Sequence, residues 1–288
     1  MGPLRVKFWG TRGLVPSPRK TTAIFGGNTT CIQVLHDNYL IIVDTGYGVA
    51  LLGESLVEKI VKEKQKLEVH IFFSHFHWDH ILGLPFFHPI YFPSTQLHLY
   101  APATRDQTWK SLDILFDGSY SPFAGIDRMP SKILFHQLVG PITIGDMAIS
   151  FAALEHHIHG NERQESQTYA YRFDCEKYSL VVASDHEAKE GAANDSFVKF
   201  AKNASILIHD AQYTEKDPFV GWGHSTVTQA LNNARRIQST LTLLTHHDPQ
   251  RDDDEILALD AEYKKKPEFS GLNFEFAREG AIYDPSKF

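Results

Sequence analysis

Three histidines and one aspartate fall within one six-residue segment, HFHWDH at positions 75–80. His75 and His77 are two residues apart, so in an extended chain both side chains face the same side. Asp79 and His80 are adjacent and point apart unless the chain turns there, so the four side chains suit two neighbouring metal ions better than one. Imidazole and carboxylate ligands together favour zinc, iron or manganese over calcium or magnesium. The alternative interpretation is a set of exposed or core histidines that hold no metal.

Other unusual polar residues follow segments that read as strands. Apolar runs such as 69–73 and 241–245 are typical of strands, and each ends just before a potential ligand or base. Early strands are joined as hairpins and later strands alternate with helical segments, a pattern that a mixed sheet system flanked by helices would bury. Active sites in α/β folds gather on loops at strand ends, so we expect the site there. The residues that follow the strands are His75, His156, Asp185, Asp210 and His246.

Composition limits the classes of protein that fit. The 288 residues carry a net charge of −7, which argues against a general nucleic-acid surface. No run approaches the about eighteen apolar residues of a membrane span, and the first residues lack the apolar region of a secretory signal. Cys31 and Cys175 are the only cysteines, too few to staple a chain of this size. We therefore expect a cytoplasmic protein with no membrane partner.

The HFHWDH segment resembles the metal-binding signature of the metallo-β-lactamase superfamily, and further motifs follow in the order of that family. VDTG at 43–46 resembles its early Asp-x-Gly turn, in which Asp44 would orient a metal-bound histidine. The segments that resemble the remaining ligand positions are ALEHH at 153–157, VVASDHE at 181–187 and LTLLTHHD at 241–248. The resemblance implies an α/β fold, an αββα sandwich of two mixed β-sheets flanked by helices. We expect one such domain across residues 1–288.

The same resemblance implies ligands for two divalent metal ions, which we expect to be Zn²⁺, with Mn²⁺ as the alternative. One ion would be held by His75, His77, His156 and Asp185. The other would be held by Asp79, His80, His246 and the shared Asp185. The segment EHHIHG also offers His157 and His159 for the third histidine, and of these we favour His156.

Three stretches resemble the superfamily branch that contains tRNase Z and related phosphodiesterases. They are FWGTRGLVPSP at 8–18, ILIHDAQYT at 206–214 and GWGHSTVTQA at 221–230. Ser225 or Thr226 would cap a helix, which places His224 at a helix N-terminus, a location suited to phosphate. Asp210 would accept a hydrogen bond from one ring nitrogen of His224 and leave the other for the substrate. We therefore predict that His224, Asp210 and Asp79 are catalytic, with His224 as the proton donor.

Two observations bear on the substrate. FGGNTTC at 25–31, with the metal segment, resembles cyclic-nucleotide phosphodiesterases, including the anti-Pycsar enzymes. The stretch 104–132 has no basic cluster and does not resemble the Gly/Pro-rich arm with which tRNase Z grips tRNA. We therefore predict a homodimeric, dinuclear metal phosphodiesterase that hydrolyses 3′,5′-cyclic nucleotides to nucleoside monophosphates, and we do not expect nucleic acid as a partner. The alternatives are an RNA 3′-processing endonuclease and a metal-bearing sensor without turnover.

For several residues near these motifs the sequence allows two roles, one functional and one structural. We predict substrate contacts by Gly27, Asn28, Thr29 and His224, although a plain turn before a strand also explains the first two. Arg12 is either structural or phosphate-facing. Trp78 and Trp222 either pack at the rim of a cavity or stack on a base.

Overall fold

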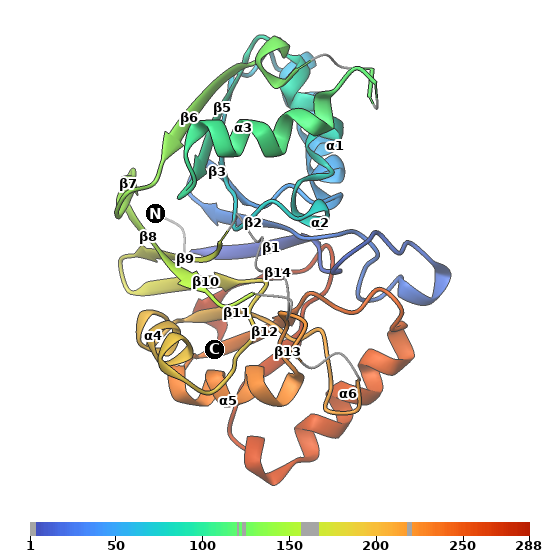
Figure 1. Cartoon of the computed structure of the whole chain (residues 1–288), viewed down its shortest axis with the longest axis vertical. Helices are drawn as coiled ribbons and strands as arrows, with labels where there is room; N and C mark the ends of the chain where they lie inside the picture. Colours follow the sequence, from blue (N-terminus) through green and yellow to red (C-terminus); the bar gives the residue numbers. More distant parts are fainter. Residues whose placement is uncertain (1–3, 120, 123–124, 157–166, 218–220) are drawn as a thin grey trace.

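The computed structural model of the chain describes residues 4–119, 121–122, 125–156, 167–217 and 221–288 (Figure 1). Within these residues, two seven-stranded β-sheets pack face to face. Figure 1 shows α1 and α3 on the outer side of one sheet and α4, α5 and α6 beyond the other. The predicted αββα sandwich is therefore confirmed. In the described part of the chain, no helix is long and apolar enough to cross a membrane.

Each sheet combines antiparallel hairpins with parallel crossovers, as the sequence predicts. The first has the order β14-β1-β2-β3-β4-β5-β6 and is parallel from β3 to β6. Its strands are β1 (Arg5–Gly10), β2 (Cys31–His36), β3 (Tyr39–Val43), β4 (Leu67–Phe72), β5 (Thr95–Ala101), β6 (Lys132–Gln137) and β14 (Ile282–Tyr283). The second has the order β13-β12-β11-β10-β9-β8-β7 and is parallel from β13 to β10. Its strands are β7 (Ile142–Ile144), β8 (Met147–Leu154), β9 (Thr168–Cys175), β10 (Tyr178–Ala183), β11 (Ile206–Asp210), β12 (Leu241–Thr245) and β13 (Phe274–Phe276).

The helices differ in length and in how they begin. The α-helices are α1 (Gly48–Val61), α2 (Trp78–Ile81), α3 (Arg105–Asp113), α4 (Ala192–Phe200), α5 (Val227–Ile237) and α6 (Asp253–Lys265). Short 3₁₀ turns lie at Lys20–Thr22, Leu84–Phe86, His88–Tyr91, Ile114–Phe116, Ile126–Arg128, Pro267–Phe269 and Pro285–Lys287. Capping boxes, in which a side chain and a backbone amide bond reciprocally, start α3, α5 and α6.

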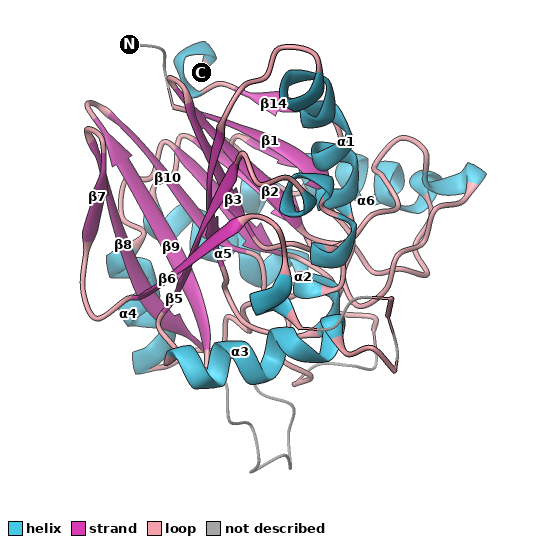
Figure 2. Cartoon of the chain, turned by 90° about the horizontal axis from the view of Figure 1, so that it is seen from above, coloured by secondary structure: helices cyan, strands magenta, loops and turns pink. Residues whose placement is uncertain are grey.

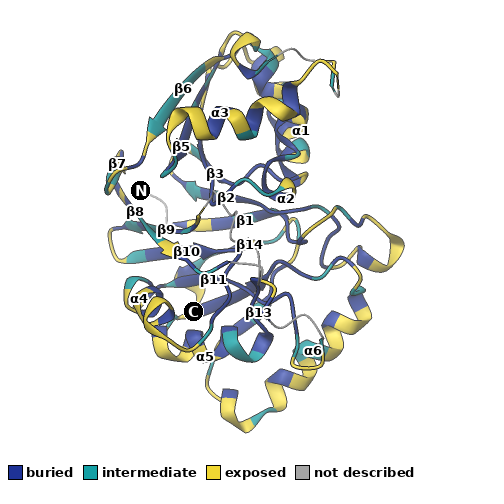
Figure 3. Cartoon of the chain, viewed as in Figure 1, coloured by how far each residue is buried: buried dark blue, intermediate teal, exposed yellow. Residues whose placement is uncertain are grey.

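Apolar side chains fill both the space between the sheets and the space beneath the helices. In β1, Val6 and Phe8 are buried against the second sheet while the intervening Lys7 is half-buried, which is the alternation of a strand. On the outer side, Leu52, Leu56 and Ile60 share one face of α1 and pack with residues of β4 and β5. Figure 3 shows the resulting pattern, with buried strands between helices whose outer faces are exposed.

The parallel strands bring the predicted ligand loops to one edge of the sandwich. Val43 pairs with Phe72 at the ends of β3 and β4, so the loop after β3 lies beside the loop that carries HFHWDH. In the second sheet, Ala183 of β10 pairs with His209, and Asp210 of β11 pairs with Thr245. The residues that follow these strands are therefore held at the same edge, as the strand-end pattern predicts.

A buried tyrosine joins the two sheets at this edge. The Tyr171 hydroxyl on β9 donates a hydrogen bond of 2.6 Å to the carbonyl of Phe73, the residue that follows β4. Phe73 in turn donates its amide to the carbonyl of Tyr100 on β5. Because Tyr171 has no exposed surface, its hydrogen bond is shielded from water and fixes the start of the ligand loop.

We expect Tyr171→Phe to lower the free energy of unfolding by about 1–2 kcal/mol, because a buried carbonyl loses its partner. Urea denaturation of the chelator-treated protein measures this loss. Tyr178→Phe, at a half-buried position on the neighbouring strand, is the matched control and should change stability by less than about 0.5 kcal/mol. Equal effects of the two substitutions would show that the Tyr171 hydroxyl does not stabilise this junction.

Candidate metal centre

Three histidine nitrogens converge at the end of β4. His75 Nε2 lies 2.9 Å from His77 Nδ1, and His156 Nε2 lies 3.1 Å from the same His77 atom. In a neutral imidazole, the ring nitrogen that carries no proton presents a lone pair. Lone pairs that point toward one another repel unless a cation lies between them. The three donor atoms therefore have the arrangement of a tridentate metal site. The structure brings His156 to this site, while His157 and His159 lie outside the described residues.

A second group of four buried side chains lies beside the first. His80 Nε2 is 3.0 Å from Asp185 Oδ1, and His246 Nε2 is 3.0 Å from Asp79 Oδ2. The backbone amide of Leu14 also donates to Asp79 Oδ2, at 2.9 Å, which fixes that carboxylate from the opening segment of the chain. The donor atoms of Asp79, His80, Asp185 and His246 all lie within 4.8 Å of one another.

Asp185 lies between the two groups. Its Oδ2 is 3.2 Å from His246 Nε2 and 3.8 Å from both His75 Nε2 and His156 Nε2. The carboxylate therefore has the position that a ligand shared by two ions requires. This arrangement matches the division into two ligand sets that the sequence resemblance implies.

Hydrogen bonds on the far side of the rings fix which nitrogen faces inward. The Nδ1 of His80 donates to Asp44 Oδ2 at 2.8 Å, that of His156 donates to the Gly223 carbonyl at 2.6 Å, and that of His246 donates to Gln212 Oε1 at 2.9 Å. Each bond uses Nδ1 and aims Nε2 into the cluster, which is the orientation that a metal ligand needs.

Asp44 supports the first histidine loop as well as His80. Its carboxylate accepts the Ser74 amide at 2.8 Å and the Ser74 hydroxyl at 2.7 Å. Asp44 adopts a left-handed backbone conformation, with φ of 62°, and so does His246, with φ of 61°. Non-glycine residues seldom adopt this conformation, and such strain is concentrated at functional sites. The orienting role that the sequence predicts for Asp44 agrees with this geometry.

Burial and charge set the protonation states of the two groups. Burial lowers the pKa of His156 to about 4 and also lowers the pKa values of His75 and His77, so this group is neutral near pH 7. Burial works against protonation of His246 too, but the carboxylates of Asp185 and Asp79 raise its pKa to about 9. In the metal-free chain the second group therefore balances charge with a proton, which an incoming cation would displace.

These residues fit a pair of metal ions by the chemistry of their donor atoms. His80 Nε2 and Asp185 Oδ1 are buried and make no hydrogen bond, although they lie close together. A tetrahedral zinc site with nitrogen and oxygen ligands at about 2.0–2.2 Å places those ligands roughly 3.3 Å apart, close to the separations found in both groups. A cation between the donor atoms would satisfy the orphaned pair.

Asp210 and His224 form a pair next to the second group. His224 Nδ1 donates to Asp210 Oδ2 at 2.6 Å, and Asp210 also accepts the backbone amides of His186 and Gln212. The ring of His224 stacks on that of His246, with centroids 4.7 Å apart. Thr226 is the N-cap of α5 and His224 precedes this cap by two residues, so His224 lies at the helix N-terminus as the sequence predicts. The Asp210–His224 contact is thus confirmed as geometry.

Other predicted residues have partners within the protein. Arg12 is fully buried and donates to the carbonyls of Gly26, Asp248 and Arg251, which makes it structural and not phosphate-facing. The amides of Gly27 and Asn28 donate to Glu279 Oε2, and the Thr29 hydroxyl accepts the Tyr47 amide. Because these groups are already engaged, the geometry favours the plain turn, and substrate contacts by Gly27, Asn28 and Thr29 stay a prediction.

The structure adds residues that sequence reasoning missed. Gln212 and the Gly223 carbonyl orient two ligands, although neither type of group has a distinctive spacing in sequence. Gly13 lies so close to His246 that a Cβ atom at this position would overlap the imidazole ring. The opening motif therefore contributes a close backbone approach to the last ligand, a role that only glycine can fill.

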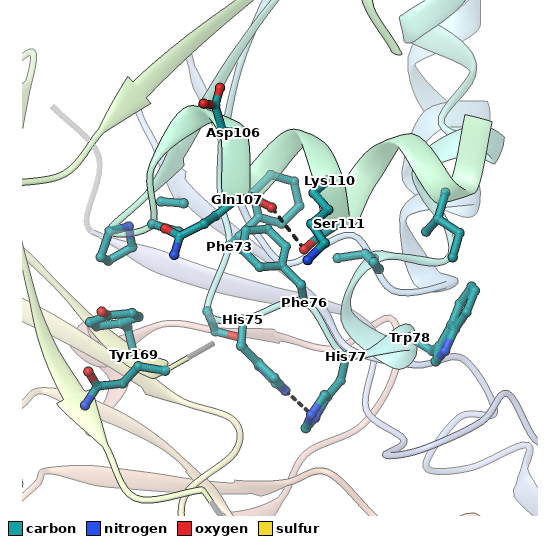
Figure 4. A pocket seen from close by; sticks show the side chains of 17 residues that line it. Phe73, His75, Phe76, His77, Trp78, Asp106, Gln107, Lys110, Ser111 and Tyr169 are labelled. Carbon is teal, nitrogen blue, oxygen red and sulfur yellow. Dashed lines mark hydrogen bonds between the residues drawn. The ribbon is translucent and has the colours of Figure 1, made fainter. Parts of the chain in front are cut away.

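A cavity of about 810 Å³ opens beside the histidine group. His75 and His77 form part of its wall, and Figure 4 shows the helix α3 running across from them. The cavity is lined by the polar side chains Gln107 and Lys110 of α3, by the aromatic side chains Phe76 and Trp78 that follow β4, and by Tyr169 of β9. Trp78 is 60% exposed, so it stands at the rim and is not packed into the core.

We expect His75→Ala and Asp185→Asn each to lose at least one bound transition-metal ion per chain relative to the unaltered protein. The His75→Ala substitution removes one donor nitrogen, and Asp185→Asn removes the negative charge that both donor groups share. Elemental analysis of protein purified without chelator measures the content. His88→Ala, at an exposed histidine, is the control and should retain the full content. Only trace metal in the unaltered protein would rule out the metal centre.

Comparison with known proteins agrees with the fold and the site. The family model described as the β-lactamase superfamily domain matches residues 39–247. A curated relative, Ribonuclease Z of Pyrococcus horikoshii, is 21% identical and aligns over 86% of this chain and 87% of its own length.

Solved structures with the same fold include the metallo-β-lactamase fold protein YhfI of Bacillus subtilis, with a TM-score of 0.67 and 21% identity over 99% of this chain and 100% of that one. Yeast PDE1 has a TM-score of 0.64 and 18% identity over 99% of this chain and 100% of that one. The family match spans most of the chain and includes every residue of both donor groups. The chain therefore belongs to the metallo-β-lactamase superfamily, as a metallo-hydrolase similar to members of its tRNase Z-like branch.

Proposed function

We propose that this chain is a metal-dependent phosphodiesterase that hydrolyses 3′,5′-cyclic nucleotides to nucleoside monophosphates. The observation that carries the proposal is the combination of two adjoining donor groups with the Asp210–His224 pair beside them, where one of the donor groups borders a cavity. Such a site needs a substrate that presents anionic oxygens to the cations and a leaving oxygen to the histidine. A phosphodiester has both.

The donor groups would hold two divalent ions, for which we propose Zn²⁺ with Mn²⁺ as the alternative, and these would supply an activated water and neutralise charge on the phosphate. The ligands His75, His77 and His156 would hold one ion, and Asp79, His80 and His246 would hold the other. Asp185 would join them. Asp79 is also held by the Leu14 amide, so its carboxylate keeps one orientation through the reaction.

His224 is the group that we assign to proton transfer. Its Nδ1 proton is held by Asp210, and a donor atom of His224 lies within 4.8 Å of donor atoms of His156 and Asp185. A proton on Nε2 would pass to the ribose oxygen as the bond to phosphorus breaks, and Asp210 would stabilise the imidazolium before that transfer. In this arrangement His224 would lie between the phosphate of the substrate and the N-terminus of α5.

The cavity supports a mononucleotide as the substrate. Its volume of about 810 Å³ lies in the range of small-ligand sites, and His75 and His77 form part of its wall. Phe76, Trp78 and Tyr169 offer aromatic faces on which a nucleobase would stack, while Lys110 places a positive side chain in the same wall. We therefore propose that the base lies between the HFHWDH loop and α3.

The stretch 104–132 provides a further argument. In the part of it that the structure describes, α3 packs through Trp109 and Leu112 into the apolar cluster beneath the first sheet. Leu115, Phe116 and Ile126 are buried in the same cluster. The described part of this segment is thus a wall of the cavity and not a projecting arm, which supports a small substrate over a folded RNA.

RNA 3′-processing is the second candidate, because curated relatives across most of the chain are named Ribonuclease Z. The same donor groups and the same Asp210–His224 pair would serve an RNA phosphodiester. A sensor without turnover is disfavoured because binding alone does not need the Asp210–His224 pair. A homodimer and a cytoplasmic location stay predictions from the sequence.

A substrate panel separates the first two candidates. We expect the metal-loaded protein to turn over one or more of cAMP, cGMP, cCMP and cUMP much faster than a linear dinucleotide or a precursor tRNA, because the cavity fits one nucleotide. Product analysis by chromatography measures each rate, with Asp185→Asn as the inactive control. Efficient trimming of the tRNA without turnover of any cyclic nucleotide would establish the RNA candidate instead.

His224→Ala should lower kcat for a cyclic nucleotide by about a hundred- to ten-thousandfold without loss of metal, because the leaving oxygen loses its proton donor. Asp210→Asn should lower kcat less than His224→Ala does. The double variant should have about the same kcat as His224→Ala, since the effects of substitutions in residues that act as one unit are not additive. Hydrolysis of bis-p-nitrophenyl phosphate should suffer less, because its leaving group needs little protonation.

Metal analysis and the two substrates together test the assignment. If His224→Ala removes an ion, His224 is a ligand. If it slows both substrates to the same extent with metal intact, it positions the substrate and does not donate the proton.

A further inference from the structure

A second type of donor cluster lies away from the metal centre, where three hairpin turns meet. His36 Nε2 is 2.9 Å from Asp146 Oδ1 and 3.2 Å from Cys175 Sγ, and Cys175 Sγ is 3.6 Å from Asp146 Oδ2. These three residue types are common zinc ligands, and their donor atoms fall within one coordination shell. The function proposed above uses none of them.

Local structure holds each of the three side chains in place. His36 ends β2 and pairs with Tyr39 across the two-residue turn at 37–38. Cys175 ends β9 and pairs with Tyr178 across the turn at 176–177. Asp146 lies in the two-residue turn between β7 and β8, where Gly145 has a φ of 59°. Because tight turns fix their backbone, the three donors are positioned before any ligand arrives.

The cluster is distinct from the metal centre. The Tyr169 amide, near the start of β9, bonds to the Ser74 carbonyl at the ligand loop, whereas Cys175 is the last residue of the same strand. Six residues of strand separate the two points by roughly 20 Å. Figures 1 and 2 show β7, beside this cluster, at one edge of the molecule and well separated from α2, which carries part of the HFHWDH segment.

The separations within the cluster agree with a metal site. Zinc bound to nitrogen and oxygen at about 2.0–2.2 Å and to sulfur at about 2.3 Å spaces its ligands roughly 3.3–3.6 Å apart in a tetrahedron. The three observed separations range from 2.9 to 3.6 Å, so movements of a few tenths of an ångström would bring these donors to three of the four tetrahedral positions and leave the fourth for water. Asp146 has 35% of its side chain exposed and provides the way in from solvent, while His36 is shielded.

Charge also favours a cation here. Burial and the Asp146 carboxylate raise the pKa of the Cys175 thiol to about 11, with Glu176 and Asp37 adding to the negative field. An unliganded thiol in this place is therefore protonated, and it is too buried to attack a substrate. A divalent ion reverses this, because it binds the thiolate and is attracted by the same carboxylates.

We propose that His36, Asp146 and Cys175 form a third metal site, which takes a divalent ion with affinity for sulfur and nitrogen such as Zn²⁺. His36 comes from the first sheet, and the other two residues come from the second. The ion would therefore join the two sheets at the end opposite the catalytic loops, in a structural role. Binding replaces the thiol proton with the metal, and that proton is released to solvent.

Cobalt substitution tests the site without any measurement of activity. The chelator-treated protein, kept reduced with a phosphine, is titrated with Co²⁺ and followed in the near ultraviolet, where thiolate-to-cobalt charge transfer absorbs. The metal centre has only histidine and aspartate donors, so it cannot give this band. We expect the band in the unaltered protein and in Cys31→Ala, which removes the other, fully buried cysteine. We expect Cys175→Ala to lack the band.

Asp146→Asn provides a second test that does not touch the buried thiol. Its partly exposed position makes it tolerant of substitution, and loss of a direct ligand should raise the Co²⁺ Kd read from the band at least about tenfold. No band in the unaltered protein, a band that persists in Cys175→Ala, or an unchanged Kd in Asp146→Asn would each overturn the proposal and leave a hydrogen-bonded Cys–His–Asp cluster.

Discussion

The main constraint on this structure is that two carboxylates and five imidazoles are held together, largely away from water, at one edge of a β-sandwich. Taking such groups out of water costs several kcal/mol for each charge unless opposite charge compensates it. Asp185 lies at the centre of this problem, between one group of neutral histidines and another whose members share charge with Asp79. Cations between the donor atoms would compensate that charge, and the hydrogen bonds that fix the orientations of the surrounding rings agree with such an arrangement.

The scaffold serves this constraint by delivering each donor from a strand end. The parallel register between β3 and β4 places Asp44 against the HFHWDH loop, and that between β11 and β12 places Asp210 near His246. Two of these residues, Asp44 and His246, keep a left-handed backbone that the chain tolerates only because both side chains are held by hydrogen bonds. Gly13 then permits the opening segment to approach the last ligand closely.

The cavity wall is built from a different part of the molecule from the donor groups. The donor groups by themselves do not distinguish a small substrate from a large one. The wall formed by α3 and the exposed Trp78 limits the space next to His77, and this wall packs on the first sheet through Trp109. The fold that the chain shares with relatives at about 20% identity does not specify a substrate, so our substrate proposal rests on this wall and not on the fold.

The sequence by itself singled out the candidate metal ligands in HFHWDH and at the strand ends that carry Asp185 and His246, because these are local patterns. It also predicted the hairpins, the alternation of later strands with helices and a helix cap at Ser225 or Thr226. It did not predict β7, β13, β14 or the packing of α3, whose short or polar segments have no strong periodicity. Only tertiary structure showed that Arg12 is structural, that His156 meets His77, and that Cys175 meets His36 and Asp146. The His156–His77 and Cys175–His36 contacts join residues 79 and 139 positions apart, and the bond from Arg12 to the Asp248 carbonyl spans 236 positions, so these contacts depend on sheet register and not on neighbouring residues.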